Sequence, residues 1–108
     1  MTDENAVGTE LAYEDERVRV WRIDLLPGEE APLHTHRLDY TSVVIEGDAV
    51  ERLNADGTVE RLTVQPGGFM RWHQGSLRHG LRNVGTVRFR NVIVELKDVE
   101  AGEPHSPG

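Results

Sequence analysis

Two histidines separated by one residue, His34 and His36, are the part of this sequence whose side chains could do chemistry together. In a β-strand, residues i and i+2 point to the same face, so the two imidazoles would converge on one point. Convergent imidazoles suit a metal ion, for which histidine is the commonest ligand. On a buried face the pair needs hydrogen-bond partners or a metal. The spacing therefore indicates a candidate pair of metal ligands.

The elements that position this pair are predicted to be short β-strands. β-branched and aromatic residues recur in short runs between turns rich in Gly, Pro, Asn and Asp. The segment 54–57, Asn-Ala-Asp-Gly, is typical of a hairpin turn. No segment shows a helical stripe over three turns. The sequence thus predicts an all-β sandwich or barrel, with strands at 17–26, 33–36, 40–46, 49–53, 58–64, 69–73, 77–84 and 86–96.

Glycines and polar residues recur around the histidines at regular distances. The first pattern is Gly28-x5-His34-x-His36-x3-Tyr40-x6-Gly47, and the second is Gly68-x5-Gln74-Gly75-Ser76-x2-His79-x3-Asn83. Together they resemble the two motifs of the cupin superfamily, Gly-x5-His-x-His-x3-4-Glu-x6-Gly and Gly-x5-Pro-x-Gly-x2-His-x3-Asn. The resemblance covers about 17–97, and the linker 48–67 has an ordinary cupin length. Within the superfamily, the chain is similar to small single-domain bacterial cupins.

The resemblance implies a fold and a metal site. The expected fold is a double-stranded β-helix, the cupin jelly-roll barrel. The implied ligands of one divalent metal ion are His34, His36 and His79. Three imidazoles can hold Fe(II), Zn, Ni or Mn, and they leave coordination positions open for substrate, water or dioxygen. Cupins with three histidines include dioxygenases that act on thiols and diketones.

The sequence departs from the family pattern in both motifs. Tyr40 stands at the position of the motif glutamate, and Gln74 and Ser76 replace the proline and the second glycine. Loss of the carboxylate leaves a net-dicationic site around a divalent ion. We expect Tyr40 to be an acid, a hydrogen-bond donor to substrate or a phenolate ligand, the alternative being an interior packing aromatic. Asp39 is expected on the opposite face, as a surface or turn residue.

Other side chains have alternative placements in this scheme. His73 is expected either to replace the missing glutamate as a fourth ligand or to pack at the rim, and His105 lies in the C-terminal tail. Arg71 and Arg82 would contact a carboxylate substrate if they point inward, and would be solvated otherwise. The two tryptophans are expected in the core or at an interface.

Charge and composition limit the partners. Six acids and no base occur in residues 1–16, whereas 13 acids and 12 bases share residues 17–108. We expect 1–16 to be a flexible acidic arm, 17–97 the barrel and 98–108 a flexible tail. A nearly neutral body argues against nucleic acid as a partner. The absence of cysteine, of a signal sequence and of a long apolar run leads us to expect a cytoplasmic protein without membrane contact.

A small molecule is the expected partner, together with a second copy of the chain. The functional expectation is a dioxygenase-like, metal-dependent enzyme acting on a small organic molecule. The alternatives are a metal-dependent isomerase, a non-catalytic barrel that binds metal or ligand, and a structural barrel with a vestigial site. A homodimer is expected because the edge strands of a short barrel need covering. Segments 18–25 and 86–96 are the candidate interface strands.

Overall fold

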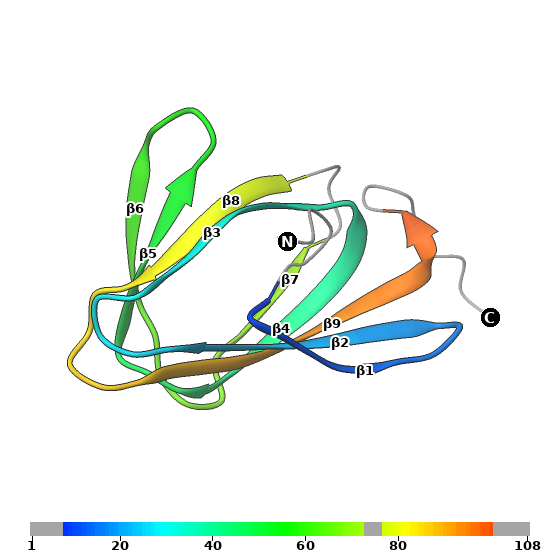
Figure 1. The fold of residues 1–108 in the computed structure, drawn as a ribbon, viewed down its shortest axis with the longest axis horizontal. Coiled ribbons are helices and arrows are strands. Elements are labelled where there is room, and N and C mark those ends of the chain that lie inside the picture. The colour runs from blue at the N-terminus through cyan, green and yellow to red at the C-terminus, as the bar shows by residue number, and fades with distance from the viewer. Residues whose placement is uncertain (1–7, 73–76, 101–108) are drawn as a thin grey trace.

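The computed structural model describes residues 8–72 and 77–100, which form two antiparallel sheets. One sheet has five strands in the order β1-β2-β9-β4-β7, and the other has four in the order β3-β8-β5-β6. In Figure 1 the layer of β3 and β8 faces the layer of β2 and β9. This is the all-β fold that the sequence predicted, in the double-stranded β-helix arrangement that the family resemblance implied. Its strands are β1 (Glu10–Glu14), β2 (Val18–Leu25), β3 (Glu30–His36), β4 (Leu38–Glu46), β5 (Ala49–Asn54), β6 (Val59–Thr63), β7 (Phe69–Trp72), β8 (Leu77–Asn83) and β9 (Phe89–Glu100).

The eight strands expected from the sequence are all present, with boundaries shifted by a few residues. The hairpin predicted at 54–57 joins β5 to β6, and Gly57 at its tip has a φ of 92°. One strand was missed: β1 lies in the stretch expected to be an arm, and it pairs with β2 along a register interrupted between Leu11 and Tyr13. Lys97 donates to Glu14 at 2.7 Å, joining β9 to β1. Residues 1–7 and 101–108 lie outside the described residues.

The core lies between the two sheets, where alternate side chains of the strands point inward. Along β2, Trp21, Ile23 and Leu25 are buried while Arg22 and Asp24 between them are exposed. This alternation is the two-residue period of a strand with one buried face. The remaining buried apolar side chains come from four other strands and are Ala31, Tyr40, Val50, Phe89 and Ile93.

Two motif residues stabilise the end of the barrel away from the histidines. Asn83 is almost fully buried, and its Nδ2 donates to the carbonyls of Leu25 and Val87 at 2.9 Å each. Gly47 has a φ of 148°, and a Cβ there would lie 2.7 Å from Cδ1 of Phe89. The asparagine and the glycine thus have structural roles: one joins strand ends, and the other lets a core ring approach the backbone.

The strand order limits how the expected interface could form. Strand β2 coincides with the segment 18–25 and β9 covers 89–96 of the segment 86–96, and both strands are flanked by other strands of their sheet. Their backbone edges are therefore already paired and cannot extend the sheet into a second subunit.

Within the described part of the chain, no helix is long and apolar enough to cross a membrane.

Candidate metal centre

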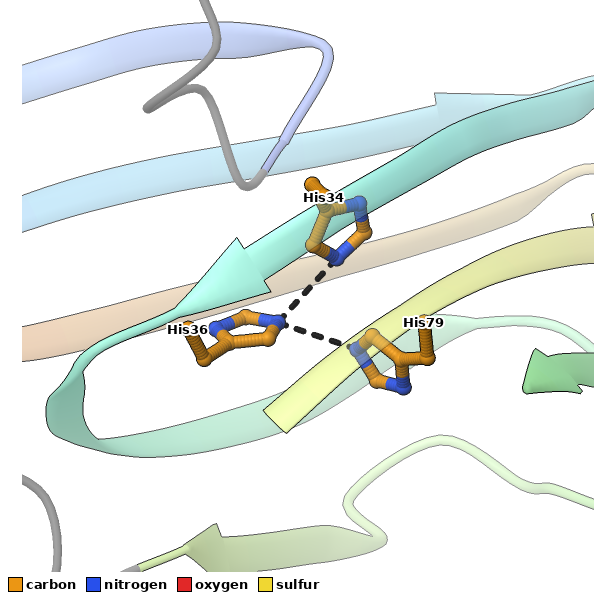
Figure 2. Close-up of side chains that lie close together, drawn as sticks. All are labelled: His34, His36 and His79. Atoms are coloured by element: carbon orange, nitrogen blue, oxygen red, sulfur yellow. Dashed lines mark hydrogen bonds between the residues drawn. The ribbon is translucent and has the colours of Figure 1, made fainter. Parts of the chain in front are cut away.

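Three buried histidine side chains meet inside the barrel. His34 and His36 come from β3, and His79 comes from the neighbouring β8, where it is the direct cross-strand partner of His34. Figure 2 shows the three rings pointing toward one another. Nε2 of His36 lies 3.1 Å from Nε2 of His34 and 3.0 Å from Nε2 of His79. The structure thus brings together the three histidines that the sequence singled out.

A β-bulge in β3 gives the histidines their inward direction. Ala31 is paired with Leu81 and His34 with His79, so β3 has one residue more than β8 across this interval. Ala31 and His34 are both buried, whereas the two residues between them are exposed. Strict alternation from Ala31 would have pointed His34 outward. The extra residue therefore shifts the phase of the strand and places both histidines on the inner face.

The same bulge orients the first imidazole. Nδ1 of His34 lies 2.9 Å from the carbonyl oxygen of Pro32, to which it donates a hydrogen bond. With its proton on Nδ1, a neutral His34 presents a bare lone pair at Nε2. Backbone contacts of this kind fix the tautomer and ring orientation of metal-ligating histidines. Pro32 also has no N–H to leave unpaired at the bulge.

All three imidazoles are held in their neutral form by burial. Loss of hydration lowers the pKa of His34, and it lowers the pKa of His36 to about 2 and that of His79 to about 3. Mutual repulsion among the rings contributes further in the case of His36 and His79. Neutral imidazole is the form that binds metal, so protons compete weakly for these nitrogens.

The donor set fits a cation better than it fits protons. One nitrogen carries one proton, so Nε2 of His36 can make a linear hydrogen bond to only one of its two close neighbours. Nδ1 of His36 and of His79 is buried and has no hydrogen-bond partner among the residues described. A divalent ion among the three Nε2 atoms would accept all three lone pairs at once. Such an ion would be held by histidine nitrogens alone.

Tyr40 forms a wall of the site. Its ring stacks on that of His36, with centroids 4.3 Å apart and planes at 28°. Its hydroxyl lies 3.8 Å from Sδ of Met70. Desolvation raises the pKa of Tyr40 to about 12, so the phenol keeps its proton at neutral pH. The inward placement considered for Tyr40 is confirmed, whereas its catalytic role remains a prediction.

A cavity of about 590 Å³ opens beside the three histidines. Most of its walls are apolar side chains from both sheets, including Val44, Leu62, Leu81, Phe89 and Ile93. Arg52 on β5 also lines it, and the sequence reasoning missed this residue. The signal was available, because Val50 and Arg52 are two residues apart on one strand and so share a face.

Several other expectations are corrected or fall outside the described structure. Asp39 was expected on the surface but has no exposed area, because the pairing of β4 with β9 shifts register between Leu38 and Tyr40. Arg82 points outward, 3.2 Å from Glu30 and 3.4 Å from Glu51. Trp21 is in the core as expected. The side chains of Arg71 and Trp72, and all of Gln74, Ser76, His73 and His105, lie outside the described residues.

Comparison with known proteins shows the same fold in solved structures. A cupin domain from Bordetella pertussis Tohama I is 25% identical over 90% of this chain and 98% of its own, with a TM-score of 0.73. A double-stranded β-helix protein from Klebsiella pneumoniae MGH 78578 is 27% identical over 88% of this chain and 72% of its own, at a TM-score of 0.63.

A third structure resembles the chain more distantly. It is a sugar phosphate isomerase of the cupin superfamily from Silicibacter pomeroyi DSS-3, 20% identical over 75% of this chain and 51% of its own, at a TM-score of 0.55. This likeness bears on the fold alone. No family model and no curated protein matches the sequence.

Proposed function

We propose that this small, single-domain cupin-like protein binds one divalent metal ion through Nε2 of His34, His36 and His79, and acts as a dioxygenase on a small organic molecule. The observation that carries the proposal is the convergence of three neutral, buried imidazoles beside a cavity. A divalent ion on three imidazoles keeps open positions and supplies Lewis-acid or redox chemistry there. A dioxygenase adds both oxygen atoms of O₂ to its substrate, so no separate reductant is consumed.

The residues of the chain would bind and orient the substrate. The apolar walls would hold its carbon skeleton and exclude water from the reacting end. Tyr40 holds a proton on Oη at neutral pH and can donate a hydrogen bond to an oxygen atom of the substrate. Its stacking on His36 keeps the phenol beside the metal-binding nitrogens.

Metal content tests the first part of the proposal. Elemental analysis of the untagged protein should find about one divalent ion per chain, and His34→Ala and His79→Ala should each lose it. Thr35→Ala is the matched control, because Thr35 lies between the two ligands of β3 but accepts a hydrogen bond from the exposed Arg78 on the other face. Metal-free native protein that takes up no Fe(II), Zn, Ni or Mn on reconstitution would overturn the site.

Oxygen uptake tests the second part. The iron-loaded protein should consume O₂ with at least one member of a panel of small carboxylates, thiols and diketones, and His79→Ala should not. Bound zinc or nickel in the native protein, with no oxygen uptake after iron loading, would instead indicate a non-redox role. An isomerase or a ligand-binding barrel would then replace the dioxygenase.

A further inference from the structure

Among the described residues that line the cavity, Arg52 is the one with a permanently charged side chain, and none is acidic. Two buried acids, Asp39 and Glu95, lie outside the lining. Glu95 accepts a hydrogen bond from Nε1 of Trp21 at 2.7 Å and lies 3.9 Å from Nη1 of Arg19. The lining therefore carries positive charge from Arg52, to which a divalent ion would add.

The guanidinium of Arg52 is poorly satisfied by the residues around it. Its Nη1 lies 3.9 Å from the half-exposed carboxylate of Glu60, which is longer than a hydrogen bond. Its Nη2 contacts Sδ of Met70 at 3.7 Å, and a thioether is a weak acceptor. The side chain is only 17% exposed. An arginine whose five donors have little solvent exposure and only weak protein partners is suited to bind a planar anionic acceptor.

Arg52 lies close to the candidate metal centre. On adjacent strands, Arg52 pairs with Leu81 and Asn54 pairs with His79, so Arg52 and His79 are diagonal neighbours on the inner face. Diagonal neighbours in an antiparallel pair are about 7–8 Å apart. The hydroxyl of Tyr40 contacts the same Met70 sulfur as the guanidinium. A ligand a few atoms long could therefore reach both Arg52 and the histidines.

From this arrangement we infer that the cavity binds a small organic carboxylate, with its carboxylate paired to Arg52 and its apolar body against the walls of the cavity. The guanidinium fork matches two carboxylate oxygens. Most of the walls are apolar, with Ser42, Thr63, Gln65 and Asn91 among the other lining residues, and this majority fits a hydrocarbon body better than a sugar. The inference names the substrate class for the proposed metal site, but the pairing to Arg52 needs no metal.

Three probes of one shape test this inference: phenylacetate, phenylacetamide and benzylphosphonate. Their affinities are measured by chemical-shift titration of the full-length protein, once metal-free and once loaded with zinc. Phenylacetate should bind at least tenfold more tightly than phenylacetamide in both forms, since hydrogen bonds to a charged group are involved. Arg52→Gln should weaken phenylacetate binding tenfold to a hundredfold and leave phenylacetamide binding within threefold. Tighter binding of benzylphosphonate than of phenylacetate would overturn the carboxylate class.

Matched variants keep the test falsifiable. Arg82→Gln removes the same charge from the outer face of the neighbouring strand β8 and should change no affinity by more than twofold. Arg52→Lys keeps the charge without the fork and should fall between the native protein and Arg52→Gln, which tests the role even if the glutamine variant is unstable. Unchanged phenylacetate binding in both Arg52 variants would overturn the inference. Arg52-dependent binding of phenylacetate by a protein that takes up no Fe(II), Zn, Ni or Mn would uphold the inference and refute only the proposed metal function.

Discussion

The carbonyl oxygen of Pro32 accepts a hydrogen bond from Nδ1 of His34 at 2.9 Å, so a backbone bulge holds a candidate metal ligand. Across from the bulge lies Gly80, one residue after His79 on β8. A Cβ at Gly80 would lie 2.9 Å from the carbonyl oxygen of Ala31 and 3.3 Å from the backbone nitrogen of Leu33. The glycine thus makes room for the bulge that aims His34 inward.

Gly80→Ala should therefore weaken metal binding without changing a ligand. The added methyl group pushes on backbone atoms of the bulge, which displaces His34 from its partners. We expect zinc affinity to fall about tenfold to a hundredfold, the usual effect of disturbing a ligand's support. The free energy of unfolding should fall by about 1–3 kcal/mol through overpacking. Competition with a chelator measures the first quantity and urea denaturation the second.

Gly57→Ala is the control for this prediction. Gly57 has a φ of 92° at the tip of the β5–β6 hairpin, with no atom within 4 Å of the added methyl group. Backbone strain should lower its stability by about 1 kcal/mol. Zinc affinity should not change. Equal zinc affinities for Gly80→Ala and the native protein would contradict the role of the bulge.

The bulge also explains which parts of the site could be predicted from the sequence. The pairing of His34 and His36 on one face follows from their spacing, and His79 from the family motif. Their inward direction depends on one extra residue in β3, which shows only in the register with β8. The burial of Asp39 was mispredicted for the same reason, since a register shift in β4 breaks strict alternation there. The two-residue period of a strand does not by itself show where such register shifts occur.

Arg52 shows a second limit of reasoning from sequence. Its spacing to Val50 indicates the inner face of β5, but the sequence does not show what lies beside it on that face. The pairing with β8 is what places it beside His79. Strand β1 was missed because the six acids of residues 1–16 made this stretch resemble a solvated arm. In the structure, Glu14 and Glu10 of β1 instead form ion pairs with Arg19 and Arg22 of β2. In both cases the pairing with a neighbouring strand decided the outcome.

The metal-free protein should lose stability as the pH falls below about 6.5. The folded pKa values of His36 and His79, about 2 and 3, lie below the ordinary value of 6.5, so the unfolded chain takes up protons that the folded chain does not. Stability is thus fully present above pH 6.5 and is lost as the pH falls toward the folded values. Each imidazole should contribute up to about 1.4 kcal/mol per pH unit.

Urea denaturation at pH 7, 6 and 5 with a chelator present measures this slope. His36→Gln removes one of the buried imidazoles, so its stability should fall less steeply with pH than that of the native protein. Carboxylates contribute equally to both proteins, and the difference therefore isolates His36. Parallel slopes for the two proteins would contradict a buried, neutral His36.

Tyr40→Phe should separate a hydrogen-bond donor from a metal ligand. The substitution removes the hydroxyl but keeps the ring that stacks on His36. If Tyr40 donates to substrate, metal affinity should stay within about threefold, whereas kcat/KM or ligand affinity should fall about tenfold for one lost hydrogen bond. A phenolate ligand would instead give a charge-transfer band in the iron(III)-loaded protein that Tyr40→Phe abolishes. Tyr13→Phe, at an exposed tyrosine of β1, should change neither quantity.

The outer face of the five-stranded sheet is where we expect a second copy of the chain to bind. Val43 and Ile45 of β4 share this face and are 38% and 47% exposed, and Val92 is the cross-strand partner of Val43. Burying adjacent apolar side chains in a dimer would remove them from water. The faces of the inner strands remain available even though their edges are paired.

Size-exclusion chromatography with light scattering tests the dimer at micromolar concentration. The native protein should have twice the mass of the chain, and the double substitution Val43→Glu with Ile45→Glu should halve it, because two carboxylates would be buried against each other across the interface. Val59→Glu is the control, since Val59 is similarly exposed but lies on β6 of the other sheet. A monomeric native protein would contradict this prediction. So would a dimer that survives the double substitution but dissociates with Val59→Glu.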